Sequence, residues 1–356
     1  MLKIDTSGTP FQRGRQQGEQ TSELASAWMG RSLEAMRARS GGPSVEELVE
    51  NCRPAVQRWL GQWEAVYPAG VEECRGLAAG LETDEQTYFT AVLHHRLSGS
   101  LPQCTLVGTI DGGDAVFGKT DDIAREELGM NVLEVSRPRD GYAHLHFHFG
   151  GTVWTVAGMN ECGLAMGMTG IPGPMLEEDG LFSLMALHTV LPECADLPAA
   201  LDHIGGLKVN AYGFSLLLAD AADRLALLEK SGAGMTVRQC GADGDFLVHT
   251  NPILDPDFAS RNPEQNEPVR TNGVRRYVNA RALAQSGAPI EEILRDRSAR
   301  GAICQQGEDQ LHTDFAVVFR PARRALDLWA GYPAEVEPET VDVAAALSAE
   351  VGWPAT

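Results

Sequence analysis

Cys104 is the residue whose position in the sequence most clearly suggests chemistry. It stands where an irregular stretch, residues 98–103, gives way to a strand-like run that Cys104 itself opens. A cysteine placed there can act as an N-terminal nucleophile, because its thiol can attack the carbonyl of Gln103. An N→S acyl shift and hydrolysis would then free the α-amine of Cys104, whose ordinary pKa of about 8 suits it as the base for its own thiol. The alternative is that Cys104 is a small apolar residue at the start of a strand.

Three histidines offer a second kind of chemistry. His144, His146 and His148 alternate along a strand-like run, so they share one face of the strand. Three imidazoles can bind zinc and leave a position for water, which makes a metal-dependent hydrolase the alternative function. Alternate strand residues lie about 7 Å apart, too far for all three rings to reach one ion at about 2 Å. We therefore expect no metal, with the apolar residues between the histidines in the core and the histidines facing a cleft or water.

The elements that position these residues change character near residue 100. Before it the patterning is helical, with capping boxes at Ser44–Glu47 and Thr83–Gln86, and residues 20–100 are predicted to form a bundle. After it strands dominate and pair with their chain neighbours, first across the tight turn Asp111–Asp114. This order predicts a layered α+β protein, with residues 1–103 as a helical segment and residues 104–356 as the catalytic core. Strands are expected at 104–110, 115–119, 131–136, 142–149, 153–157, 164–168, 214–219, 225–229, 246–250, 314–319 and 325–330, and later helices at 181–191, 198–204, 274–284 and 290–297.

Composition excludes several classes of partner. The chain has 356 residues and a formal net charge of -20, which repels nucleic acid and anionic lipid. No apolar run approaches the roughly 20 residues of a membrane helix, and the first residues carry no apolar signal-peptide core. We expect a cytoplasmic protein that binds neither nucleic acid nor membrane. Its 7 cysteines contain no C-x-x-C and are expected to be free thiols.

Several short motifs occur in an order that resembles a known family. Cys104-Thr105 is followed by Gly118–Asp122, with Asp122 eighteen residues after the cysteine, and then by Gly158–Ala165 (G-M-N-E-C-G-L-A) and His249–Pro252. The pattern is similar to that of the acyl-coenzyme A:isopenicillin N acyltransferase family, and more distantly to choloylglycine hydrolases and acid-ceramidase-like amidases. The resemblance implies a four-layer αββα N-terminal-nucleophile hydrolase sandwich with an N-terminal helical segment.

The resemblance also implies catalytic roles. Cys104 would be the nucleophile after cleavage of the Gln103–Cys104 bond, and Asp122 would orient the freed amine, with Asp121 as a rival for that role. Asn160 and Asn251 would donate N–H groups to an oxyanion, or they are ordinary turn asparagines.

Other residues are expected to contact the substrate. Lys119 and Thr120 stand where bile-salt-type relatives have arginine and asparagine, so they would orient a substrate differently. Arg276 or its neighbour Arg275 would hold a substrate carboxylate, unless both belong to a solvated helix end. With Arg261, Arg270 and Arg281 they form a basic cluster that could receive the phosphate of coenzyme A or of a carrier protein.

The sequence therefore predicts a cysteine-nucleophile amidohydrolase or acyltransferase. Its partner would be a small-molecule amide or acyl thioester, which includes acyl-coenzyme A and acyl carrier protein, and its own cleaved N-terminal segment would stay associated. The chemistry at Cys104 requires no cofactor. Water as acceptor gives hydrolysis and an amine gives acyl transfer, and both remain open because they differ in how a pocket excludes water.

Overall fold

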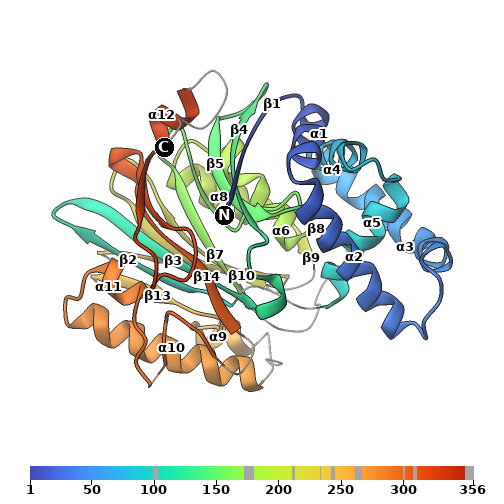
Figure 1. Ribbon diagram of the computed structural model, residues 1–356. Coiled ribbons are helices and arrows are strands. Elements are labelled where there is room, and N and C mark those ends of the chain that lie inside the picture. Colours follow the sequence, from blue (N-terminus) through green and yellow to red (C-terminus); the bar gives the residue numbers. More distant parts are fainter. Residues whose placement is uncertain are drawn as a thin grey trace.

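The computed structural model describes residues 1–98, 103–171, 180–210, 213–232, 234–241, 245–260, 267–299, 301–307 and 311–348. Two β-sheets pack face to face at its centre, and helices cover their outer faces (Figure 1). The inner faces meet through ring contacts such as Phe147 on Phe315, whose centroids are 4.8 Å apart. The predicted αββα layering is confirmed.

The large sheet has eight strands in the order β1-β4-β5-β6-β7-β10-β11-β12. All described neighbours in it are antiparallel except β1 and β4, which run parallel. The strands are β1 (Leu2–Gly8), β4 (Asn131–Pro138), β5 (His144–Phe149), β6 (Ala157–Asn160), β7 (Ala165–Ile171), β10 (Gly213–Ala219), β11 (Leu225–Ser231) and β12 (Gly234–Gln239).

The small sheet has six antiparallel strands in the order β13-β2-β3-β14-β15-β16. Gly112 and Gly113 have φ of +59° and +96°, which lets the predicted turn join β2 to β3. The strands are β13 (Phe246–His249), β2 (Thr105–Asp111), β3 (Asp114–Ala124), β14 (Leu311–Arg320), β15 (Ala325–Trp329) and β16 (Glu339–Asp342). A short parallel pair, β8 (Leu181–Phe182) and β9 (Val209–Asn210), lies apart from both sheets.

Helices cover both outer faces. On the small sheet lie α10 (Glu267–Gln285) and α11 (Ile290–Leu294), packed on an apolar cluster that includes Val107 and Val318. On the side of the large sheet lie α1 (Pro10–Gln20), α4 (Pro68–Gly80), α6 (Ser183–His188), α7 (Val190–Glu193) and α8 (Leu197–Gly206), while α9 (Pro256–Ser260) and α12 (Val343–Ser348) fill the edges.

The N-terminal segment contains the predicted helices and one strand that the sequence analysis did not predict. Helices α2 (Ser22–Arg39), α3 (Val45–Val66) and α5 (Glu85–Ser98) join α1 and α4, and the capping box at Ser44 is confirmed. Helices α1 and α4 approach closely, because a Cβ at Gly14 would lie only 1.9 Å from the Glu73 carbonyl oxygen. The segment is not purely helical, because β1 extends the large sheet beside β4.

Other differences are local. The predicted strand at 153–157 begins only at Ala157, and the residues before it are irregular. All seven cysteines are free thiols, as predicted. Among the described residues, no helix is both long and apolar enough to cross a membrane.

Candidate active site

Cys104 lies directly before β2, between the two sheets, and its side chain is 0% exposed. Its Sγ is 3.2 Å from Lys119 Nζ and 3.6 Å from Asp121 Oδ1. Because residues alternate along a strand, Lys119 and Asp121 share the face of β3 that points toward the large sheet. The thiol, an ammonium group and a carboxylate therefore meet in one buried place.

The charges of this group are coupled. Burial raises the pKa of the Cys104 thiol to about 12, and Lys119 opposes that rise. Burial lowers the pKa of Lys119, but its 2.5 Å ion pair with Asp121 and its contact with Cys104 outweigh the effect and raise it. Lys119 is therefore a fixed cation beside the thiol. Asn131 holds the other oxygen of Asp121 at 3.0 Å, so the carboxylate has a defined orientation.

Asp122 points to the opposite face of β3, toward α10. Thr313 Oγ1 and Gln305 Nε2 donate to its carboxylate at 2.6 and 2.7 Å, and Arg276 Nη1 lies 3.8 Å away. Burial raises the pKa of Asp122 to about 6, although Arg276 opposes the shift. The backbone oxygen of Asp122 accepts a 3.0 Å hydrogen bond from the Gln103 N–H. Gln103 is thereby paired with β3 just before the nucleophile.

Arg276 is buried against the backbone of Cys104. Its Nη1 donates to the Cys104 carbonyl oxygen at 2.7 Å and to Thr105 Oγ1 at 3.1 Å. Its Nη2 donates to Asn251 Oδ1 at 2.6 Å, and its Nε to Asn272 Oδ1 at 2.7 Å. Arg276 is thus not part of a solvated helix end, and its donors already hold protein oxygens.

Thr169, on β7, is a contact that sequence analysis missed. Its Oγ1 accepts from the Cys104 N–H at 3.3 Å and lies 3.5 Å from the Cys104 carbonyl oxygen, to which it can donate. Asn251 Nδ2 donates to the same Oγ1 at 3.1 Å and to the Gly170 carbonyl at 2.9 Å. The signal was a single hydroxyl residue within the apolar run that follows the G-M-N motif. Asn131, Gln305 and Thr313, which hold the two aspartates, carried no such signal.

Several predicted site residues lie elsewhere. Asn160 Nδ2 donates to the carbonyl oxygens of Leu191 and Cys194 at 2.9 and 2.7 Å, so this asparagine holds a turn against α7 and is not an oxyanion donor here. Thr120 Oγ1 accepts from the Thr105 N–H at 3.1 Å, on the face of β3 away from the thiol.

The predicted basic cluster is divided. Arg275 and Arg281 are exposed on α10, whereas Arg276 is buried beside the nucleophile. Arg261 and the side chain of Arg270 lie outside the described residues.

The histidine strand belongs to a different place. His144, His146 and His148 are no more than 2% exposed, so the expectation that they face a cleft or water is wrong. Their neighbour Phe147 points inward to Phe315, so the histidines occupy the outer face of the large sheet, beneath helices. They do not contribute to the Cys104 group.

Comparison with known proteins identifies the family. The family model described as acyl-coenzyme A:6-aminopenicillanic acid acyl-transferase matches residues 109–335, more than half of the chain. The chain belongs to this family. It is therefore an enzyme of the N-terminal-nucleophile class, an acyltransferase or amidohydrolase whose substrates are small acyl or amide compounds.

Solved structures resemble the chain only distantly. Penicillin V acylase from Agrobacterium tumefaciens is 15% identical with a TM-score of 0.43, over 67% of this chain and 84% of that one. Conjugated bile acid hydrolase from Clostridium perfringens is 12% identical with a TM-score of 0.44, over 67% and 96%. An N-acylethanolamine-hydrolyzing acid amidase orthologue from Caenorhabditis elegans is 12% identical with a TM-score of 0.42, over 65% and 97%. None of the curated proteins matches the sequence significantly.

Proposed function

We propose that this enzyme cleaves itself between Gln103 and Cys104 and then transfers or hydrolyses an acyl group through a thioester at Cys104. The family match begins after Cys104, so the assignment of the nucleophile depends on the site itself. The observation that carries it is the contact of Sγ with Lys119 Nζ at 3.2 Å, while Arg276 and Thr169 hold the backbone of the same residue.

Self-cleavage needs a base other than the α-amine, because in the uncleaved chain the nitrogen of Cys104 is an amide. Asp121 Oδ1, which accepts from the thiol at 3.6 Å, takes the proton, and Lys119 stabilises the resulting thiolate. The thiolate attacks the Gln103 carbonyl carbon, the C–N bond breaks, and the proton passes to the leaving nitrogen. Water then hydrolyses the Gln103 thioester and leaves a free thiol and α-amine on Cys104.

Cleavage also uncovers the thiol. Cys104 is fully buried in the uncleaved chain, and Gln103 is held over it by its hydrogen bond to Asp122. Release of the new Gln103 carboxylate would open a path for a substrate acyl group. Asp122 then serves as a positioning residue, because it lies beside Arg276, which fixes the Cys104 carbonyl. Thr169 and Asn251 supply polar groups next to the reacting atoms.

The acyl-enzyme is a thioester that water or an amine can resolve, and the substrate is an amide or an acyl thioester. Residues 1–103 would remain as a bound subunit, because β1 pairs with β4 along its whole length. The exposed Arg275 and Arg281 on α10 are the described part of the surface available to a carrier phosphate.

Intact mass spectrometry and N-terminal sequencing of the purified protein test this proposal. We expect two associated chains, residues 1–103 and 104–356, the second beginning Cys-Thr-Leu-Val. Cys104→Ala should stay in one piece and show no turnover, whereas Cys74→Ala, which alters another buried cysteine, should process normally. Normal processing or turnover of Cys104→Ala would refute the nucleophile, and an active enzyme that remains one chain would refute self-cleavage.

A further inference from the structure

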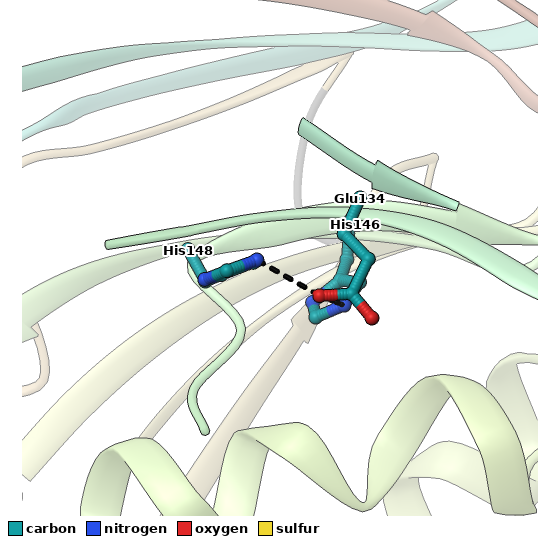
Figure 2. A group of neighbouring side chains, drawn as sticks. All are labelled: Glu134, His146 and His148. Atoms are coloured by element: carbon teal, nitrogen blue, oxygen red, sulfur yellow. Dashed lines mark ion pairs between the residues drawn. The ribbon is translucent and has the colours of Figure 1, made fainter. Parts of the chain in front are cut away.

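A second polar cluster lies on the outer face of the large sheet and takes no part in the chemistry proposed for Cys104. His146 and His148 stand on β5, and Glu134 stands directly opposite His146 on β4. The exposed fractions of the three residues are 1% for Glu134, 2% for His146 and 0% for His148. Figure 2 shows all three side chains on the side of their sheet that faces a helix, away from the strands of the small sheet.

The spacing of their polar atoms suits a single metal ion. One nitrogen from each ring and one carboxylate oxygen lie within 4.8 Å of one another. Glu134 Oε2 is 3.0 Å from His148 Nε2 and 3.7 Å from His146 Nε2. Ligand atoms bound at about 2.0–2.1 Å to a tetrahedral ion lie about 3.3 Å apart, which falls between those two distances. The neighbouring strand therefore supplies the third ligand that His144 is too far along β5 to provide.

Both rings turn the same nitrogen toward the carboxylate. The Nε2 atoms of His146 and His148 are buried, and the partner of each within the described residues is Glu134 Oε2. His148 Nδ1 lies 2.8 Å from the carbonyl oxygen of Phe149 and 3.2 Å from Gln17 Nε2, and these two contacts hold the ring with Nε2 toward Glu134. The other oxygen of Glu134 accepts from Thr6 Oγ1 at 2.5 Å. Such hydrogen bonds behind the ligands orient histidines and carboxylates in metal sites.

The charges also leave room for a cation. Arg13, the nearby buried arginine, is paired with Glu73 at 2.5 Å. Within the described part of the chain, the ion pairs of Glu134 are with the two histidines only. A buried carboxylate needs a positive partner, and a divalent ion between the two rings would provide one.

We propose that Glu134, His146 and His148 bind one divalent transition-metal ion of the zinc type, with water as the fourth ligand. This set of two histidines and one carboxylate is typical of zinc. Because all three ligands are buried, the role is structural. The ion joins β4 to β5 and, through Thr6, holds the N-terminal strand β1 beside them. The site reverses the expectation of a metal-free protein, but it does not depend on the chemistry of Cys104.

Metal analysis of the Cys104→Ala chain tests the site independently of cleavage. After purification without chelator, inductively coupled plasma mass spectrometry should find about one equivalent of metal per chain. Removal with dipicolinate should lower the melting temperature by several degrees, and one equivalent of Zn²⁺ should restore it. Co²⁺ added to the metal-free chain should give the visible absorption of a four-coordinate ion. This measurement requires no ligand variant.

Variants locate the ion. His148→Ala and Glu134→Gln should each lose most of the bound metal, whereas His144→Ala, which removes a buried histidine of the same face, should keep it. If His148→Ala does not fold, the metal content of Glu134→Gln tests the site instead, because that substitution is nearly isosteric. The proposal is overturned if the metal-free chain takes up less than about 0.1 equivalent of Zn²⁺, Co²⁺, Mn²⁺ or Fe²⁺ with no change in melting temperature. An imidazolium would then be the partner of Glu134. Retention of metal by both ligand variants would overturn it equally.

Discussion

The burial of Asp122 makes the stability of the fold depend on pH. Its carboxyl group is fully buried and its pKa is raised from 3.8 to about 6, chiefly by burial. Because the pKa is raised in the folded state, this carboxyl contributes stability fully below about pH 3.8, and the contribution is lost as pH rises through about 6. A shift of about two units corresponds to about 2–3 kcal/mol, so the ionised carboxylate destabilises the fold by that order above pH 7.

Asp122→Asn in the uncleaved Cys104→Ala background tests this reasoning. The amide cannot ionise, so the variant should gain about 2–3 kcal/mol of unfolding free energy relative to its parent between pH 4 and pH 8. Lost or altered hydrogen bonds to Thr313 and Gln305 shift the unfolding free energy of the variant by the same amount at every pH. They therefore do not affect how the difference between variant and parent changes with pH. Urea denaturation at half-unit pH steps measures the difference.

A matched control separates burial from net charge. Asp111→Asn removes one negative charge from an exposed position at the end of β2. Because the chain carries a formal net charge of -20, both substitutions relieve general repulsion to a similar extent. The reasoning would be refuted if Asp122→Asn and Asp111→Asn showed the same dependence on pH, or if the stability of Asp122→Asn relative to its parent were constant from pH 4 to 8.

Two further predictions concern single contacts. Thr169→Val keeps the shape of the residue but removes the hydroxyl beside Cys104 N, so self-cleavage and turnover should each slow by about 10²-fold. Thr169→Ser, which keeps the hydroxyl, should restore both rates. A gel time course measures cleavage and a steady-state assay measures turnover, and unchanged rates in Thr169→Val would contradict the role. Glu73→Gln removes the partner of buried Arg13 and should cost about 3–5 kcal/mol in urea denaturation at pH 7, unlike Glu72→Gln at an exposed neighbouring position. Despite its burial, Arg13 and His188 hold the pKa of Glu73 down to about 2, so in the parent protein this stabilisation is present above about pH 4.5 and is lost as pH falls toward 2.

Local patterns predicted most of the fold but not its first strand. The hairpin at Asp111–Asp114 and the capping box at Ser44 are set by neighbours in sequence, and both appear as expected. Strand β1 alternates buried Ile4 and Thr6 with more exposed residues, yet its partner β4 lies more than a hundred residues away. A short amphipathic run is compatible with several structures, and only that distant parallel pairing decides between them.

The candidate site was predictable to the extent that it lies along one hairpin. Lys119, Asp121 and Asp122 follow Cys104 on the paired strand, so their proximity could be inferred from the turn. Thr169 and Arg276 come from the other sheet and from a helix, and no local spacing links them to the cysteine. For the histidines, strand alternation correctly placed them on one face. The expectation of no metal considered ligands from one strand alone and so left out Glu134, which lies opposite His146 on the next strand.

Strand β4 brings the two polar groups onto opposite faces of one sheet. Asn131 points inward and holds Asp121, whereas Glu134, three residues further along, points outward to His146 and His148. The outward group also contacts the N-terminal segment, through Thr6 on β1 and through Gln17 on α1, whose Nε2 lies 3.2 Å from His148 Nδ1. Cutting the chain after Gln103 would remove the covalent link but none of these contacts. If the enzyme cleaves itself as proposed, such contacts would keep the cut segment in place, because that segment contributes β1 to the sheet that supports the active site.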